Sequence, residues 1–242
     1  MKFFITSLFI IFFTYLSKSQ IISIGSGPIF THTNQKVKMV NSKEDFQNTG
    51  YQFCLAFEYF LKNDYLSLIG SYTKFNGSTW IKFREGSVVA SDGFPTLGVG
   101  YSGVVIHRLN LAMTYNLFNV RNRFFVKPII SIGLQNSNPD GSEYGAFERQ
   151  NGPEYFELEP ITAETFKTTQ FVPSVGIRTG VLLWGFLEFG LEIMGALGSK
   201  SYQNMNFKYM YKGNPQETAV FEAKGTGIFT TFSIGYKFGK EK

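Results

Sequence analysis

Residues 51–62 read YQFCLAFEYFLK, and the alternation within them indicates the fold class. The odd positions are all apolar or aromatic, whereas the even positions are mostly small or polar. In an extended strand, successive side chains point to opposite faces of the sheet, so a period of two separates an apolar face from a polar one. The pattern therefore predicts a β-strand with one face in an apolar environment.

The same alternation recurs along the chain and gives eight predicted strands. We find no internal repeat, no low-complexity tract and no Pro-rich linker, so a single all-β domain from residue 20 to residue 242 is expected. The clear segments are 51–62, 107–118, 186–197 and 228–238, and the weaker ones are 21–31, 65–75, 124–136 and 169–184.

The connections between these strands alternate in length. In an up-and-down antiparallel sheet alternate connections lie at the same end, so one end carries short turns and the other carries every long connection. Bacterial outer-membrane barrels have short periplasmic turns and long extracellular loops. The spacing predicts an eight-stranded antiparallel up-and-down transmembrane β-barrel with long extracellular loops. The short turns are 62–64, 119–123 and the region of Gly185, and the long connections are 32–49, 76–98, 137–168 and 198–224.

The composition supports a β protein that contacts lipid. Charged residues make up 17% of the chain and aromatic residues also 17%, whereas about 25% charged residues is typical of soluble domains. The mean hydropathy of −0.05 is too low for a bundle of transmembrane helices, and the aromatic content excludes a disordered chain.

Residues 1–19 are predicted to be a signal peptide. A basic start is followed by an apolar stretch over residues 3–16 and by small residues before Gln20. The apolar stretch is shorter than the about 20 residues that a membrane-spanning helix needs, which disfavours a membrane anchor. Removal of the peptide would take Lys2 and Lys18 from a chain with a formal net charge of +5. The remaining charge is small and dispersed, so no nucleic-acid partner is expected.

Aromatic residues gather at the short-turn ends of the predicted strands. Rings with an apolar body and a polar edge favour the bilayer interface, where they form girdles. This pattern predicts contact with outer-membrane lipid. The residues are Tyr59, Phe60, Tyr65, Tyr115, Phe118, Phe124, Phe125, Trp184, Phe186, Tyr236 and Phe238.

The segment FSIGYKF, residues 232–238, ends the last predicted strand. Together with the signal peptide and the eight alternating segments, it resembles the OmpA/OmpX-type outer-membrane β-barrel family, in particular its PorT-like members. The resemblance covers nearly the whole mature chain and implies a location in the cell outer membrane and a role in protein secretion or envelope assembly. In this family the last strand typically ends on an aromatic residue that the barrel-assembly machinery reads during insertion. Here residues 239–242 follow Phe238.

Charged residues on the polar faces should lie inside the barrel. Eight strands leave an interior that side chains just fill, and a buried charge is costly unless it is paired. We therefore expect a salt-bridge network that plugs the lumen, in preference to a proton or ion pathway. The predicted network residues are Glu58, Arg108, Lys127, Arg178, Glu188, Glu192 and Lys237.

The connection 137–168 is the candidate site for an envelope protein partner. It is rich in acids and also carries four aromatic residues, and aromatic anchors within a charged rim favour protein contacts. The last long connection has a similar composition and is predicted to form a projecting hairpin around Gly213-Asn214-Pro215. The candidate contact residues of the first connection are Tyr144, Phe147, Tyr155 and Phe156.

No metal or cofactor is expected. Residues 136–141 imitate the start of a calcium loop, but Phe147 occupies the twelfth position, where a bidentate Glu is required. Residues 139–141 also form a good turn sequence. The single cysteine, Cys54, allows neither an intramolecular disulfide nor a thiolate cluster.

A lipid-modifying enzyme is the alternative function, because outer-membrane lipid A deacylases and acyltransferases also use small barrels. Such a site requires a general base beside a Ser nucleophile near the outer rim. His107 falls on the apolar face near the outer end of its predicted strand, but Leu109 stands where the deacylase family carries its Ser. We expect an interfacial role for His107 and no catalytic residue.

The alternation by itself leaves the orientation of the two faces open. In a soluble lipocalin-like ligand-binding barrel the apolar faces would point inward, whereas in a membrane barrel they point to lipid. The polar faces are rich in Gly, Ser and Ala, and the long connections lie at one end, which favours the membrane. An open porin is disfavoured because water-filled channels have about 16 strands. The expected function is that of a structural or partner-binding envelope component.

Overall fold

The computed structural model describes residues 20–37, 42–43, 48–61, 65–83, 89–90, 96–120, 123–149, 156–158, 162–207, 209–211, 214–215 and 218–239. Across these ranges, no helix has both the length and the apolar character needed to cross a membrane. The predicted signal peptide lies outside them.

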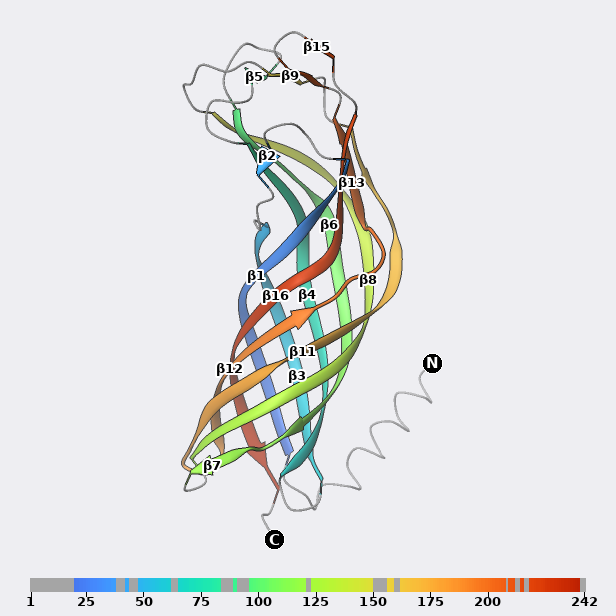
Figure 1. Ribbon diagram of the computed structural model, residues 1–242. Helices are drawn as coiled ribbons and strands as arrows, with labels where there is room; N and C mark the ends of the chain where they lie inside the picture. The colour runs from blue at the N-terminus through green and yellow to red at the C-terminus, as the bar shows by residue number, and fades with distance from the viewer. Residues whose placement is uncertain are drawn as a thin grey trace.

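Eight long antiparallel strands form a closed barrel (Figure 1). The last strand pairs with the first, from Gln20 opposite Phe238 onward, which closes the sheet. This architecture confirms the predicted fold class. In ring order the strands are β1 (Gln20–Val37), β3 (Asn48–Phe60), β4 (Leu66–Phe83), β6 (Thr96–Tyr115), β8 (Phe124–Arg149), β11 (Thr168–Leu183), β12 (Leu187–Ala196) and β16 (Ala219–Phe238).

Short strands extend this sheet. At one end β7 (Phe118–Val120) pairs with β8, and at the other end β2 (Ser42–Lys43) pairs with β4. Beyond the end of β12, β16 continues and pairs with β13 (Gln203–Phe207), which in turn pairs with β10 (Thr162–Thr165).

A second, four-stranded sheet draws three of the long connections together at the end opposite β7 (Figure 1). In it, β9 pairs with both β5 and β14, and β14 pairs with β15. We call this sheet the cap. Its strands are β5 (Val89–Ala90), β9 (Phe156–Leu158), β14 (Tyr209–Tyr211) and β15 (Asn214–Pro215).

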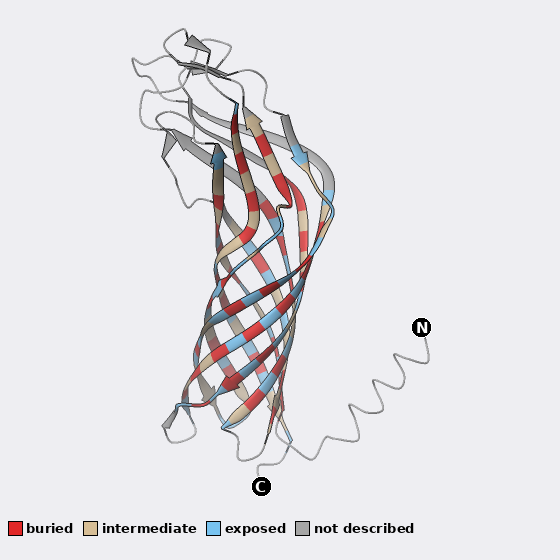
Figure 2. Cartoon of the chain, turned by 45° about the vertical axis from the view of Figure 1, so that its right-hand side comes forward, coloured by how far each residue is buried: buried red, intermediate tan, exposed pale blue. Residues whose placement is uncertain are grey.

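The apolar faces of the strands point outward, as the alternation of buried and exposed residues along each strand shows (Figure 2). Leu111 is 61% exposed and Phe171 is 66% exposed, whereas their neighbours Ala112 and Val172 are buried. Exposing such a continuous apolar band to water is unfavourable, whereas the band packs favourably against lipid acyl chains. The faces therefore have the orientation of a membrane barrel, and the lipocalin orientation is wrong.

The long connections are shorter than the sequence suggested. β4 continues to Phe83 and β6 begins at Thr96, so residues 76–83 and 96–98 belong to paired strands, and β8 continues to Arg149. Hydropathy alternates only where one face meets lipid. Beyond the apolar band both faces can be polar, so the ladder continues without its sequence signal.

The predicted turn at residues 139–141 is also wrong, because it lies inside β8. The pairing of β8 with β6 passes from Pro139 opposite Val104 to Tyr144 opposite Ser102. The intervening residues form a bulge opposite Gly103, which has a φ of 140° that side chains rarely adopt. A bulge thus takes the place of the expected turn.

Candidate functional site

A buried ionic cluster lies inside the barrel near its short-turn end. The Glu58 carboxylate, from β3, receives Lys127 Nζ at 2.7 Å and the Ser67 hydroxyl at 2.5 Å on Oε1. Arg178 Nη1 lies 3.7 Å from Oε2 of the same carboxylate. Arg178 also donates from Nη2 to Glu188 Oε1 at 2.5 Å. We call Glu58, Lys127, Arg178 and Glu188 the inner charge cluster.

The inner charge cluster is electrically balanced, with two acids and two bases. All four side chains are at most 3% exposed. Each comes from the small-and-polar face of its strand, which the alternation turns inward. Removing one member of such a group leaves an uncompensated charge in a region of low dielectric constant, so the cluster is stable only as a unit.

Aromatic rings line the inner charge cluster toward the short turns. Lys127 Nζ lies 4.8 Å from the ring centre of Phe60 and 4.7 Å from that of Phe125. Lys237 Nζ lies 5.7 Å from the Phe60 ring. A cation over the face of an aromatic ring is attracted by its quadrupole, so the rings stabilise these ammonium groups where water is scarce.

Arg108 lies apart from the inner charge cluster. Its guanidinium donates to Gln135 Oε1 from Nη2 at 2.6 Å and from Nε at 3.2 Å, and it stacks 4.4 Å from the Phe229 ring centre. Among the described residues it has no acidic partner, contrary to the expected network. A guanidinium is planar and weakly hydrated, so an amide oxygen and a ring face can satisfy it.

A small polar cavity of about 50 Å³ separates Arg108 from the inner charge cluster. Glu192 and Asn110 line it, and so does Cys54. The volume holds on the order of three waters. Glu192 makes no ion pair within the described part of the chain, but it is attracted electrostatically by Arg178, and the cavity gives it space for hydration.

A segment that the sequence did not reveal places Tyr202 in the interior of the barrel, against Gly77. Residues 197–202, which we call the strap, link β12 to β13. Gln170 Oε1 accepts hydrogen bonds from the backbone N–H groups of Ser199 and Lys200, both at 2.7 Å. Tyr202 is fully buried and packs on Gly77, where an added Cβ would lie 2.9 Å from the Tyr202 ring.

Tyr202 falls in the connection 198–224, which the sequence predicts to form a projecting hairpin, but its burial excludes it from such a hairpin, so the prediction is wrong for this residue. The hairpin itself is present farther along, where Tyr211 pairs with Asn214. The sequence gives little indication of the strap, because Gln170 and Ser199 are distant in sequence and no local pattern shows that they form a hydrogen bond.

The predicted partner-binding residues are placed in part. Tyr144 and Phe147 lie on the outer part of β8, opposite Ser102 and Val99 of β6. Phe156 begins β9 in the cap, opposite Tyr211. Tyr155 lies outside the described residues. The structure therefore distributes these positions between an extended hairpin and the cap.

His107 lies on the outer surface of the barrel, where the Tyr72 hydroxyl is 2.7 Å from its Nδ1. The two rings stack with their centres 6.0 Å apart. β6 continues beyond His107 to Thr96, so the expected position at the strand end is wrong. The residues directly opposite His107 are Lys74 and Asn136.

Farther from the membrane, Glu222 pairs with two lysines. Its carboxylate lies 3.1 Å from Lys224 Nζ and 3.5 Å from Lys36 Nζ. The hydrogen bond from Lys224, together with the charge of both lysines, lowers the pKa of Glu222. These two lysines therefore share one carboxylate, which offsets half of their charge.

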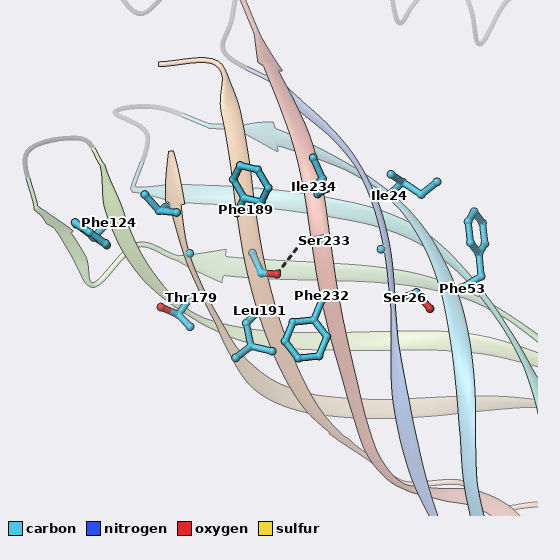
Figure 3. A pocket seen from close by; sticks show the side chains of 14 residues that line it. Ile24, Ser26, Phe53, Phe124, Thr179, Phe189, Leu191, Phe232, Ser233 and Ile234 are labelled. Atoms are coloured by element: carbon cyan, nitrogen blue, oxygen red, sulfur yellow. Dashed lines mark hydrogen bonds between the residues drawn. The ribbon is translucent and has the colours of Figure 1, made fainter. Parts of the chain in front are cut away.

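The outer wall also carries shallow apolar grooves. One, of about 800 Å³, is lined by Phe53, Phe189 and Phe232 among other apolar residues (Figure 3). The hydroxyls of Ser26 and Thr179 at its surface donate to backbone carbonyls, which leaves few polar groups to orient a solute. Such a surface fits acyl chains. No group of His, Cys, Asp and Glu suited to a metal occurs among the described residues.

Comparison with known proteins identifies the fold. No protein-family model matches the chain, and no curated protein matches it. The outer membrane protein OprG from Pseudomonas aeruginosa aligns with a TM-score of 0.51 and 11% identity, over 93% of this chain and 97% of that chain. A major outer membrane protein from Thermus thermophilus aligns with a TM-score of 0.49 and 8% identity, over 91% and 99%. Ail, the attachment invasion locus protein of Yersinia pestis, aligns with a TM-score of 0.41 and 12% identity, over 92% and 99%.

At this identity the likeness to OprG shows the fold alone. The location follows from that fold together with the outward apolar band, because closed antiparallel barrels with such a band reside in the outer membrane. The protein is an outer-membrane β-barrel.

Proposed function

We propose that this protein is a plugged barrel that serves as a structural or partner-binding component of the cell envelope and makes its contacts at the extracellular end. The observation that carries the proposal is the inner charge cluster, which joins opposite walls of the barrel through buried ion pairs. Ion pairs that join opposite walls support a lumen without a solute path. The outer walls face lipid, so the surface available to a protein partner is the end that bears the long connections.

The composition of that end supports a partner. Three connections meet in the cap, and the one from residue 150 to 161 carries acids beside Tyr155 and Phe156. Aromatic anchors within a charged rim are typical of protein interfaces. The resemblance to PorT-like proteins favours protein secretion or envelope assembly as the process served.

Replacement of residues 150–161 by a short Gly-Ser linker tests the proposal. The barrel should fold and insert, because surface connections are thermodynamically tolerant of such changes. Envelope proteins that co-purify with the native barrel after crosslinking in whole cells should be lost. A variant with residues 84–88 replaced by a linker of equal length is the matched control and should keep them.

Full retention of the co-purifying proteins by the 150–161 variant would show that this connection is not the contact site. Lipid analysis of a deletion strain addresses the alternative function. A change in the acylation of its outer-membrane lipid would indicate the lipid-modifying enzyme and overturn the proposal.

A further inference from the structure

An amphipathic site lies on the outer wall across β4 and β6. Its apolar part is a groove of about 620 Å³, whose floor is Gly70 and whose sides include Leu55, Leu109 and Leu111. A Cβ added at Gly70 would meet no atom within 4 Å, so the glycine opens the groove toward lipid. The groove has the form of a trough for an acyl chain.

The polar part of the site begins where the groove ends. Tyr72 lines the groove, and its hydroxyl lies 2.7 Å from His107 Nδ1. Lys74, which is exposed, stands directly opposite His107 on the neighbouring strand. When the tyrosine hydroxyl donates to Nδ1, Nε2 carries the proton and is free to donate outward. A cation and a donor thus stand together just beyond the trough.

The charges around this position leave Lys74 available to an anion. Among the residues of β3, β4, β6 and β8 whose exposure the structure describes, Glu58 is the only acid, and it points inward. Lys74 and His107 pair with the part of these strands that precedes the acids of outer β8. Lys36 and Lys224, in contrast, share Glu222. Lys74 lies on the side of the apolar band that bears the long connections, which is the extracellular side in barrels of this kind.

We propose that this is a binding site for a phosphate-bearing lipid of the outer leaflet. One acyl chain lies in the trough at Gly70, and the phosphate is held by the Lys74 ammonium and the His107 imidazole. Tyr72 is a positioning residue, because its hydroxyl fixes the ring of His107. Apolar burial provides affinity for any acyl lipid, and the lysine provides selectivity for the phosphate.

Native mass spectrometry of the full-length mature barrel, released from detergent micelles, tests the proposal. The probes are lipid A, a phosphorylated and acylated glucosamine disaccharide, and its dephosphorylated form. The native barrel should retain the phosphorylated probe more strongly. Lys74→Gln should lower that retention about five-fold, the effect of one lysine at a lipid surface. Gly70→Leu places an apolar side chain in the trough, where its Cβ would meet no atom within 4 Å, and should lower retention of both probes.

Lys167→Gln is the matched control, because Lys167 is an exposed lysine at the start of β11. It should retain lipid as the native barrel does, and every variant should show native heat-modifiable migration. Equal losses in Lys74→Gln and Lys167→Gln would reveal diffuse attraction and overturn the site. Equal retention of the two probes by the native barrel, or displacement of lipid A by millimolar inorganic phosphate, would overturn it as well.

Discussion

Glu58 and Arg178 meet across the whole width of the barrel. Their strands, β3 and β11, stand four positions apart in the ring of eight, so they belong to opposite walls, yet Arg178 Nη1 lies 3.7 Å from Glu58 Oε2. Arg108 of β6 spans the barrel in the same way to reach the Phe229 ring of β16. The interior is therefore held by contacts between walls as well as by the ladder within each wall.

Glu58→Gln should destabilise the barrel strongly. The change leaves Lys127 and part of Arg178 without their anion in a buried site, which costs about 3–5 kcal/mol. The free energy of unfolding in urea, measured in detergent micelles, gives the effect. Glu164→Gln, which alters an exposed acid, is the control. An unchanged unfolding midpoint in Glu58→Gln would show that the inner charge cluster contributes nothing to stability.

Leu111→Arg should be much more damaging than Thr169→Arg. Leu111 faces acyl chains near the middle of the apolar band, where an arginine costs about 2–4 kcal/mol, while near the interface the cost falls to about 0–1 kcal/mol. Thr169 is exposed just beyond Phe171 at the outer edge of that band. Folding yields in lipid vesicles measure the difference. Similar yields for the two variants would contradict the assigned membrane position.

Gln170→Leu should release the strap and leave the barrel intact. The substitution removes the acceptor of two backbone N–H groups and the donor to the carbonyls of Lys200 and Lys224. Each polar group left unpaired costs about 1–3 kcal/mol. Hydrogen exchange of residues 198–202 should accelerate at least ten-fold, with no change in β6 or β8. Thr169→Ala is the control, and uniform exchange in both variants would show that Gln170 does not hold the strap.

Cys54 gives a direct test of the plugged lumen, because it is the only cysteine and lines the interior cavity. A maleimide added from the aqueous phase should label it only after unfolding. Ser199→Cys in a Cys54→Ser background places a thiol at an exposed position and should be labelled within minutes. Rapid labelling of Cys54 in the folded barrel would mean that the lumen is open to solutes.

The sequence predicted those features that depend on the contrast between lipid and interior. Leu111 and Ala112 lie on opposite faces because hydropathy alternates there, and the same rule placed Glu58 and Arg178 inside. The pairing of each base with an acid depends on the stagger of the strands around the ring, and no local sequence pattern indicates that stagger. Arg108 shows the limit, since its ring partner Phe229 is distant in sequence and carries no charge.

The extent of the strands and the position of the strap were missed for a different reason. Outside the bilayer the environment is water on both faces, so residues 76–83 and 137–149 extend the ladder without an alternating pattern. Tyr202 is buried because Gly77 leaves space for its ring, and that complementarity exists only in the folded chain.

The fastening of the strap has a consequence for biogenesis. Gly198 N donates to the Thr226 hydroxyl and Tyr202 N donates to the Ala223 carbonyl, and both acceptors belong to β16. β16 is the last barrel strand in chain order, and its pairing with β1 closes the ring. Anchoring of the strap therefore depends on the same event as closure of the wall. A barrel arrested before its final strand docks would lack both the seam and the fixed position of Tyr202 in the interior, so the two are completed together.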